Sequence, residues 1–486
     1  MGFVAGRFGS GNLHRLDEWA LGGRRFGTIV SWFLIGGDIY TAYTFIAVPA
    51  LVFGAGALGF YAVPYAAIAY PFAYVILSRF WAIARMRGYV TAADFVRDRF
   101  SSRSLELAIA ATGILASLPY IALQVVGMKA VLIHLGGVFA IGDGELALTV
   151  AFVLLAAYTA TSGLRAPAAI AFVKDTLIYA AVIAAIVIIP GKLGGWAHVF
   201  SVASASLAAR PKPVSILLSP NQEVAYATLA FGSCLALFLY PHSITSVLAA
   251  KSQEVVRRNM ALLPIYSIML GFLALLGYCA IAAGIHTKDT SSVIPILLDR
   301  YFPQWLSGVA LAAIVIGALV PAAIMSIGSA NLFANNVVGG FRQGRAQGAS
   351  HLSRLVTIAI CAFALCFVIF VPTQYAITFQ LLGGMWMVQT VPAFVLGLYT
   401  RALHRRALLV GWAAGMATST AMAVATTAGG AGISPNITLT FAGHSVTAYI
   451  ALYGLAANLV VAVVLSPFLW MLRIGGGTDA TTGASA

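Results

Sequence analysis

Few residues in the long apolar stretches of this sequence can do chemistry, and Asp38 is the most conspicuous of them. It lies in "WFLIGGDIYTAYTF" (32–45), directly after Gly36 and Gly37. A carboxylate deep in hydrocarbon is costly unless it binds an ion, pairs with another group or faces a cavity. Two interpretations follow: Asp38 caps the half-helix after a break in the chain, or it attracts a cation or carries a proton.

A second charged feature, Lys174 and Asp175, lies in "IAFVKDTLIY" (170–179). Neighbouring side chains on a helix point about 100° apart, so we do not expect these two to pair with each other. Lys174 either extends its charge towards the cytoplasmic membrane surface along its flexible stem or takes part in ion coupling. Asp175 has a short side chain and is expected to face the bundle interior, on the path of an ion.

Uncharged polar residues form two further groups. In "VIGALVPAAIMSIGSANLFANNVV" (315–338), Ser326 and Ser329 are three residues apart and share a helix face. Small residues of this kind allow close helix packing, and their hydroxyl groups can also reach an ion. An isolated glutamine in a membrane usually joins two helices. As a set, six residues near the centres of other segments can instead hydrogen-bond a small polar solute: Tyr120, Gln124, Tyr240, His242, Gln380 and Trp386.

The amino-acid composition indicates that membrane-spanning helices position these residues. Of the 486 residues, 61% are hydrophobic and only 9% are charged, whereas a soluble domain carries roughly 25% charged residues. We therefore expect an all-α polytopic membrane protein whose apolar surface faces the lipid bilayer. Twelve segments are long and apolar enough to span the bilayer.

The basic residues predict how the chain is oriented. With a cytoplasmic N-terminus, the inside loops hold 21 basic residues and the outside loops five, and Lys129 and Lys174 lie within spans. This asymmetry is typical of membrane proteins and predicts that both termini are cytoplasmic. It also accounts for the net charge of +14 without a nucleic-acid partner.

Two of the predicted spans are interrupted near their centres, by "IGGDIYT" (35–41) in the first and "YPHS" (240–243) in the sixth. Glycine pairs and proline weaken a membrane helix at these points. Five spans separate the two breaks, so the broken spans run in opposite directions. This is the pattern of an inverted repeat with a transport site at the midplane.

The predicted organisation of the chain follows from this repeat. It comprises a cytoplasmic segment (1–25), a first five-helix repeat (26–190), an extracytoplasmic loop (191–221), a second five-helix inverted repeat (222–399), two additional spans (400–472) and a cytoplasmic tail (473–486).

Four stretches carry a resemblance to a known family over almost the whole chain. They are "LDEWALGGRRFG" (16–27), "GYVTAADFVRDRF" (88–100), "YPHSITSVLAAKS" (240–252) and "PAFVLGLYTRALHRRALLVGWAAG" (392–415). With these motifs the chain resembles the sodium:solute symporter family, and "GGDIYTAYTF" looks most like its bacterial monocarboxylate permease branch. The resemblance implies the fold of the bacterial leucine transporter, with a five-plus-five inverted repeat.

The resemblance also implies ligands for a sodium ion. The family's site matches the backbone carbonyls of Gly36 and Ile39 and, on the eighth span, Ala323, Ser326 and Ile327. Ile327 replaces a hydroxyl residue, so one expected side-chain ligand is missing. Asp175 and Asp38 match aspartates on or near the family's ion route. Substrate contacts implied by the resemblance are Tyr43, Tyr240, His242 and Gln380.

We therefore expect a cation-coupled secondary active importer of short-chain monocarboxylates such as lactate or pyruvate, working by alternating access in a bacterial inner membrane. Sodium is the expected coupling ion, and Lys174 keeps proton coupling open as an alternative, because some proton-coupled transporters of this fold place a lysine there. Another small solute (an amino acid, urea or pantothenate) and a transporter-like sensor are rival functions. No nucleophile–base pair or metal cluster in the sequence indicates an enzyme, and no cofactor beyond the coupling ion is expected.

The predicted orientation can be tested with single cysteines at Ser10 or Ser485, introduced after replacement of the four native cysteines. Neither position should react with a membrane-impermeant maleimide added to intact cells, whereas a cysteine at Lys288, in a predicted outside loop, should react. Efficient external labelling at Ser10 or Ser485 would overturn the topology.

Overall fold

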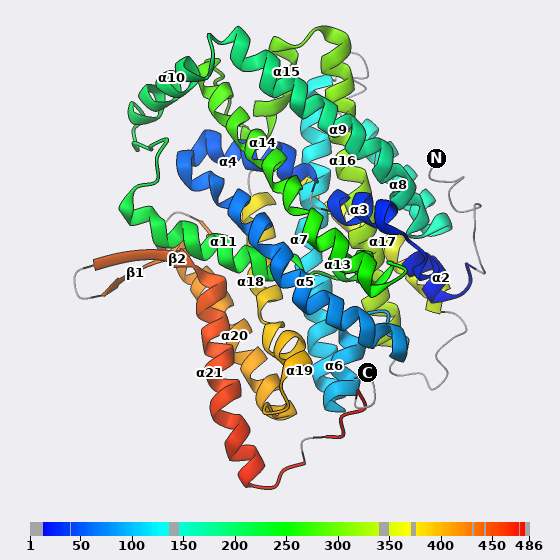
Figure 1. Ribbon diagram of the computed structural model, residues 1–486. Coiled ribbons are helices and arrows are strands. Elements are labelled where there is room, and N and C mark those ends of the chain that lie inside the picture. Colours follow the sequence, from blue (N-terminus) through cyan, green and yellow to red (C-terminus); the bar gives the residue numbers. More distant parts are fainter. Residues whose placement is uncertain are drawn as a thin grey trace.

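The computed structural model describes residues 13–38, 40–135, 145–339, 349–370, 376–429, 432–441, 444–475 and 477–481. Ser10, Ser485 and Ile39 lie outside these ranges. The first half of the chain forms the helices α2 (Leu16–Leu21), α3 (Thr28–Gly37), α4 (Val48–Ala55), α5 (Ala62–Arg87), α6 (Ala92–Phe100), α7 (Arg103–Leu135), α8 (Glu145–Ser162), α9 (Arg165–Lys192) and α10 (Trp196–Ala208) (Figure 1).

The second half continues the helical bundle. Its helices are α11 (Glu223–Leu237), α12 (Pro241–Leu248), α13 (Gln253–Leu262), α14 (Pro264–Ala282), α15 (Val293–Tyr301), α16 (Gln304–Asn331), α17 (Ala349–Phe370), α18 (Ala376–Val388), α19 (Gly397–Tyr399), α20 (Arg405–Ala425) and α21 (Ile450–Met471). Three π-helical segments extend the neighbouring helices, at Tyr43–Ala47, Leu332–Val338 and Pro392–Leu396.

In the described part of the chain, nine helices are long and apolar enough to cross a membrane, or ten if α11 and α12 form one bent span. The first predicted span is broken into the ten-residue helix α3 and the segment that begins at Tyr43, and α8 belongs with the shorter apolar helices. A polytopic membrane fold is thus evident, while the count of twelve spans stays a prediction.

The expectation of a purely helical fold missed one element. Strands β1 (Asn436–Phe441) and β2 (His444–Tyr449) pair antiparallel as a hairpin that projects from the bundle (Figure 1). The predicted last span began at residue 445, but its helix begins at Ile450. Both strands are rich in β-branched residues, which favour strands: Ile437, Thr438 and Thr440 in β1 and Val446 and Thr447 in β2. Residues 445–449 directly precede a long apolar helix, and so their sequence was predicted to be part of its span.

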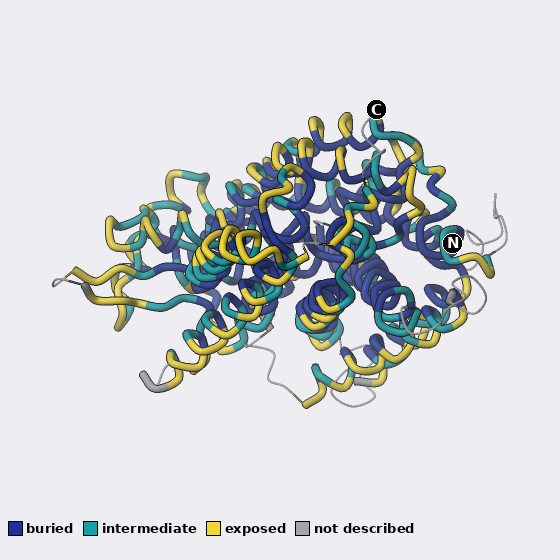
Figure 2. The backbone as a smooth tube through the Cα atoms, turned by 90° about the horizontal axis from the view of Figure 1, so that it is seen from below, coloured by how far each residue is buried: buried dark blue, intermediate teal, exposed yellow. Residues whose placement is uncertain are grey.

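The interior of the bundle is built around α7 and α16. In α7, 72% of the apolar stretch is buried within the protein, against 28% in α21. Buried backbone accordingly concentrates towards the middle of the molecule, while exposed residues lie at its periphery (Figure 2). Polar side chains on α7 and α16 therefore meet other protein groups, and lipid-facing surface is left to outer helices such as α21.

A polar network fastens α6 to the end of the eighth span. Asp94 accepts hydrogen bonds from the amide groups of Asn335 and Asn336, both at 2.7 Å. Asn336 also donates to Glu106 at 2.9 Å and accepts from the Thr91 hydroxyl at 2.7 Å. Burial raises the pKa of the Asp94 carboxyl, and the hydrogen bonds that it accepts act in the opposite direction. The motif "GYVTAADFVRDRF" thus has a structural role in joining distant spans.

Replacement of Asn336 by alanine should destabilise the protein, because the buried Glu106 and the partly buried Asp94 each lose a hydrogen-bond donor. A loss of about 1.5–3 kcal/mol is expected for hydrogen bonds to charged groups, visible as a lower apparent melting temperature in detergent. Asn221→Ala, at an exposed position, is the matched control. Equal melting temperatures for the two variants would contradict the role of the network.

Candidate functional site

The first-helix break, here Asp38 and residues 40–42, separates α3 from the π-helical segment that begins at Tyr43. Amide groups at helix ends need partners, and here side chains supply them. The Thr41 amide donates to the Thr44 hydroxyl at 2.9 Å, and the Tyr43 amide donates to the Thr41 hydroxyl at 3.0 Å. The Tyr40 amide reaches back to the Gly36 carbonyl at 3.1 Å. The break is therefore a defined local structure.

Gln124 on α7 completes this arrangement. Its side-chain oxygen accepts a hydrogen bond from the Ala42 amide at 2.9 Å, and its amide group donates to the Tyr120 carbonyl at 3.3 Å. We predicted a solute contact for Gln124 as part of a set. In this structure the residue joins the third span to the first-helix break, which is the usual role of a glutamine between membrane helices.

The sixth-helix break lies between α11 and α12, whose axes differ by 49°. Tyr240 precedes α12 in an extended conformation, and Pro241 occupies the first helical position, where its missing amide costs nothing. Ser246 on α12 donates a hydrogen bond to Asp38 at 2.5 Å. The two breaks are thus directly linked through a serine that the sequence interpretation did not single out, although its motif "YPHSITS" was the available signal.

Asp38 is fully enclosed by the protein. One carboxylate oxygen accepts from Ser246, and the other has no hydrogen-bond partner among the described residues. The amide groups of residues 40 to 43 all donate to other groups. Asp38 therefore does not cap the following half-helix, and its charge remains available to act on cations near the break.

Lys174 reaches the first-helix break from α9. Its ammonium group donates to the Gly37 carbonyl at 2.8 Å and to the Tyr40 carbonyl at 2.9 Å, and lies 3.0 Å from an Asp175 oxygen. Both charged side chains are fully buried. The interpretation that Lys174 extends towards the cytoplasmic surface is wrong, because its long side chain bends back to the first-helix break. The expectation that Lys174 does not pair with Asp175 is also wrong, because two desolvated opposite charges attract each other strongly. Asp175 faces the bundle interior as predicted.

Of the other expected sodium ligands, those in the described part of the chain lie on α3 and α16, and the site that they would form together stays a prediction. The Gly36 carbonyl accepts from the Tyr40 amide, and Ile39 lies outside the described residues. On α16, Ala323, Ser326 and Ile327 are all buried, and the Ser326 hydroxyl accepts from Cys361 of α17 at 3.6 Å. Among the described residues no hydrogen bond joins Ser326 to the first-helix break.

Four of the predicted substrate residues do meet, in a cavity that we call the tyrosine pocket. The space between its atoms is about 330 Å³, and its polar lining residues are Tyr43, Tyr65, Tyr120, Ser233, Tyr240, Gln380 and Tyr449. Three of these side chains have a buried oxygen without a hydrogen-bond partner in the described part of the chain: Ser233, Tyr240 and Gln380. Buried polar groups are normally paired, so these oxygens mark the pocket as a place for a polar guest.

Three lining residues were missed by sequence reasoning. Tyr65 lies on α5, for which no site residue was predicted. Ser233 lies on α11, which was considered only for the break that follows it. Tyr449, the last residue of β2, donates its hydroxyl to the Leu381 carbonyl at 2.6 Å and thereby closes the pocket. Its distance in sequence from the other residues left no signal for it.

His242 lies behind the tyrosine pocket. Its ring stacks on Tyr240 with centroids 5.3 Å apart and meets Tyr120 edge-on at 5.5 Å. Neither ring nitrogen has a hydrogen-bond partner within the described ranges. His242 thus supports two pocket tyrosines and is not itself a lining residue in this conformation.

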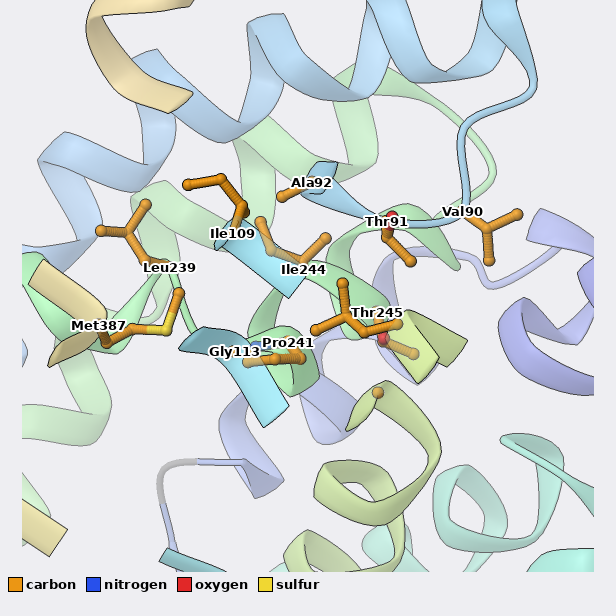
Figure 3. A pocket seen from close by; sticks show the side chains of 12 residues that line it. Val90, Thr91, Ala92, Ile109, Gly113, Leu239, Pro241, Ile244, Thr245 and Met387 are labelled. Atoms are coloured by element: carbon orange, nitrogen blue, oxygen red, sulfur yellow. The ribbon is translucent and has the colours of Figure 1, made fainter. Parts of the chain in front are cut away.

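A second, mainly apolar pocket is lined by Pro241 (Figure 3). It is bounded by Val90 and Thr91 before α6, by Gly113 of α7 and by Thr245 of α12. Gly328 of α16 also lines it and packs directly on the proline, since a Cβ there would lie 2.8 Å from the Pro241 carbonyl carbon. Residues of the sixth-helix break thus line two cavities, Tyr240 the tyrosine pocket and Pro241 the apolar one.

Two broken helices that face each other, with buried charges and a closed polar cavity beside them, define a transporter of small solutes in a membrane. The family model of the sodium:solute symporter family matches residues 19–415. The chain belongs to the sodium:solute symporter family, which confirms the assignment that the four motifs indicated, and solute symport is its general activity.

Two relatives extend over nearly the whole chain. A monocarboxylate transport permease protein of Rhizobium johnstonii is 49% identical over 472 residues, covering 96% of this chain and 94% of the relative. An uncharacterised symporter of Bacillus subtilis is 32% identical over 473 residues, covering 96% of this chain and 90% of the relative.

The fold is also found in a solved transporter. A Na⁺-coupled sialic acid symporter in a substrate-bound outward-open state superimposes with a TM-score of 0.77, covering 96% of this chain and 95% of the other at 14% identity. At this identity the likeness concerns the fold alone.

Substitution of Gly36 tests how tightly the first-helix break is packed. A Cβ at Gly36 would lie 2.4 Å from the ring of Tyr266, whereas one at Gly54 would have no atom within 4 Å. Gly36→Ala should lower stability by about 1–3 kcal/mol, as overpacked cores do, and lower the apparent melting temperature. Gly54→Ala should leave that temperature unchanged or raise it slightly, since alanine favours helices. Similar melting temperatures for both variants would refute the close packing.

Proposed function

We propose that this protein is a secondary active importer of short-chain monocarboxylates, such as lactate or pyruvate, in a bacterial inner membrane with both termini in the cytoplasm. The 49% identity to a monocarboxylate transport permease protein supports the substrate class. The orientation rests on the distribution of basic residues between the loops.

The observation that carries the proposal is the chemistry of the tyrosine pocket. Tyr240 and Ser233 bring hydroxyl groups whose oxygens lack partners in the described structure, and hydroxyl groups are good donors to a carboxylate. Tyr240 also precedes the first turn of α12, and the start of a helix favours a negative charge. A small carboxylate is therefore stabilised at this place without an arginine or lysine.

The pocket also discriminates between the rival solutes. None of its lining side chains is acidic, so the ammonium group of an amino acid would find no counter-charge. Urea lacks the negative charge that the start of α12 favours.

Two cavities lined by neighbouring residues, Tyr240 and Pro241, support transport by alternating access. In this proposal the tyrosine pocket holds the solute, and the apolar pocket beside Thr91 and Thr245 (Figure 3) lies on its route through the protein. A change in the angle between α11 and α12 would connect one cavity with the other. The buried charges at the first-helix break make this change sensitive to cations, as solute symport requires.

Uptake of radiolabelled pyruvate and lactate into proteoliposomes tests the proposal, with sodium and proton gradients imposed separately. Accumulation above the external concentration under one of these gradients, with competition by other short monocarboxylates but not by amino acids, is the expected result. Failure to accumulate either acid under both gradients would refute the substrate assignment.

Removal of one pocket hydroxyl should weaken substrate binding specifically. Tyr240→Phe keeps the ring stack on His242 but loses a donor to the carboxylate, so we expect the KM for pyruvate to rise by about 10-fold or more. Tyr226→Phe is the control, since its hydroxyl donates to the Phe60 carbonyl outside the pocket. An unchanged KM in a folded Tyr240→Phe protein would remove this hydroxyl from the site.

A further inference from the structure

Two carbonyl groups at the first-helix break, those of Gly37 and Tyr40, already bind a cation, which is the side-chain ammonium group of Lys174. The ammonium group of Lys174 is within 3.0 Å of the Gly37 carbonyl, the Tyr40 carbonyl and an Asp175 oxygen. An ammonium group has three donor hydrogens; here it donates to the two carbonyls and forms an ion pair with Asp175. The group is fully buried, so both carbonyls are occupied by a charge that belongs to the protein.

The surrounding residues hold this arrangement in place. The Tyr40 hydroxyl donates to the Tyr266 carbonyl at 2.6 Å, and the Tyr40 ring packs against Tyr179 and Tyr266 with centroids 5.8 and 4.8 Å apart. A Cβ at residue 37 would lie 3.3 Å from the lysine nitrogen, so glycine leaves the space that the ammonium group uses. The two carbonyls are thus positioned before any ion arrives.

The charges near Lys174 come from a small set of groups. Asp175 is its ion-pair partner, and Asp38 at the end of α3 lies close enough to interact with its charge. The phenol groups of Tyr40, Tyr179 and Tyr266 face the same region. The neighbouring α16 contributes no titratable side chain. One lysine thus provides the positive charge that offsets the nearby carboxylates.

Carbonyl groups at a broken membrane helix are ligands for sodium in many transporters. A sodium ion bound to the carbonyls of Gly37 and Tyr40 would have to occupy the position of the lysine nitrogen, or stand beside it with like charge. We infer that Lys174 determines the cation specificity of this transporter: its ammonium group is a tethered substitute for sodium, and the first-helix break binds no sodium ion in the wild-type protein. The inference rests on the proposed function only in taking this break as the cation site of symport.

Binding of ²²Na⁺ to the purified protein in detergent tests this without reference to the solute. The wild type should show no saturable binding at millimolar sodium. Lys174→Ala opens the carbonyls and removes the like charge, so it should bind ²²Na⁺ at least about tenfold more strongly than the wild type. Lys129→Ala, which removes the other lysine within a span, should behave as the wild type does.

A second variant, Lys174→Met, is included in case Lys174→Ala does not fold, since methionine keeps most of the apolar stem of the lysine. Either variant can be compared with the wild type in ²²Na⁺ binding if it elutes as a monodisperse peak in size-exclusion chromatography. Saturable ²²Na⁺ binding by the wild type that Lys174→Ala does not strengthen would overturn the inference. The same conclusion would follow if both folded Lys174 variants bound no sodium.

Pyruvate counterflow separates this inference from the proposed function, since it needs no ion gradient. Wild-type counterflow should be equal in sodium and choline buffers, whereas Lys174→Ala should require sodium. If no variant exchanges pyruvate in any buffer, the substrate assignment fails, and the ²²Na⁺ comparison still decides the role of Lys174. A wild type that exchanges pyruvate only with sodium would contradict the tethered cation.

Discussion

The structure depends on one constraint: charges buried in a medium of low dielectric must be matched within the protein. Lys174, Asp175 and Asp38 meet this constraint together, through two backbone carbonyls and the Ser246 hydroxyl. Their contacts connect the fifth, first and sixth spans, so the ends of the broken helices are held to one another. Without these charges, the chain would have little reason to interrupt two helices at the same depth.

Close approach of the backbones makes this matching possible. Gly127 of α7 lies against Ala42 of the first-helix break, and Gly328 of α16 lies against Pro241. Small residues at helix contacts allow such distances in membranes, where packing rather than the hydrophobic effect drives association. The central helices are therefore closely packed against both breaks.

Much of this organisation was predictable from sequence, because it follows from local composition. The spans, both breaks, the burial of Asp175 and the meeting of Tyr43, Tyr120, Tyr240 and Gln380 needed only hydropathy, helix breakers and motifs. The direction of Lys174 was not predictable, since its flexible side chain can reach the membrane surface or the interior equally well. Contacts far apart in sequence, such as Ser246 with Asp38, depend on packing that no local pattern encodes, and the hairpin was hidden because its second strand directly precedes a long apolar helix.

The hairpin is joined to the tyrosine pocket, the proposed solute site, through Tyr449. Strand β2 ends in Tyr449, whose amide group binds Thr228 of α11 at 3.0 Å and whose ring closes the tyrosine pocket. Exposed residues near the tip of the same strands project from the bundle (Figure 1). An antibody fragment bound to the strands would therefore restrict movement of the pocket wall and stabilise one conformation without competing with the solute. Natural variation in the hairpin would in the same way tune solute selectivity while leaving the buried charges untouched.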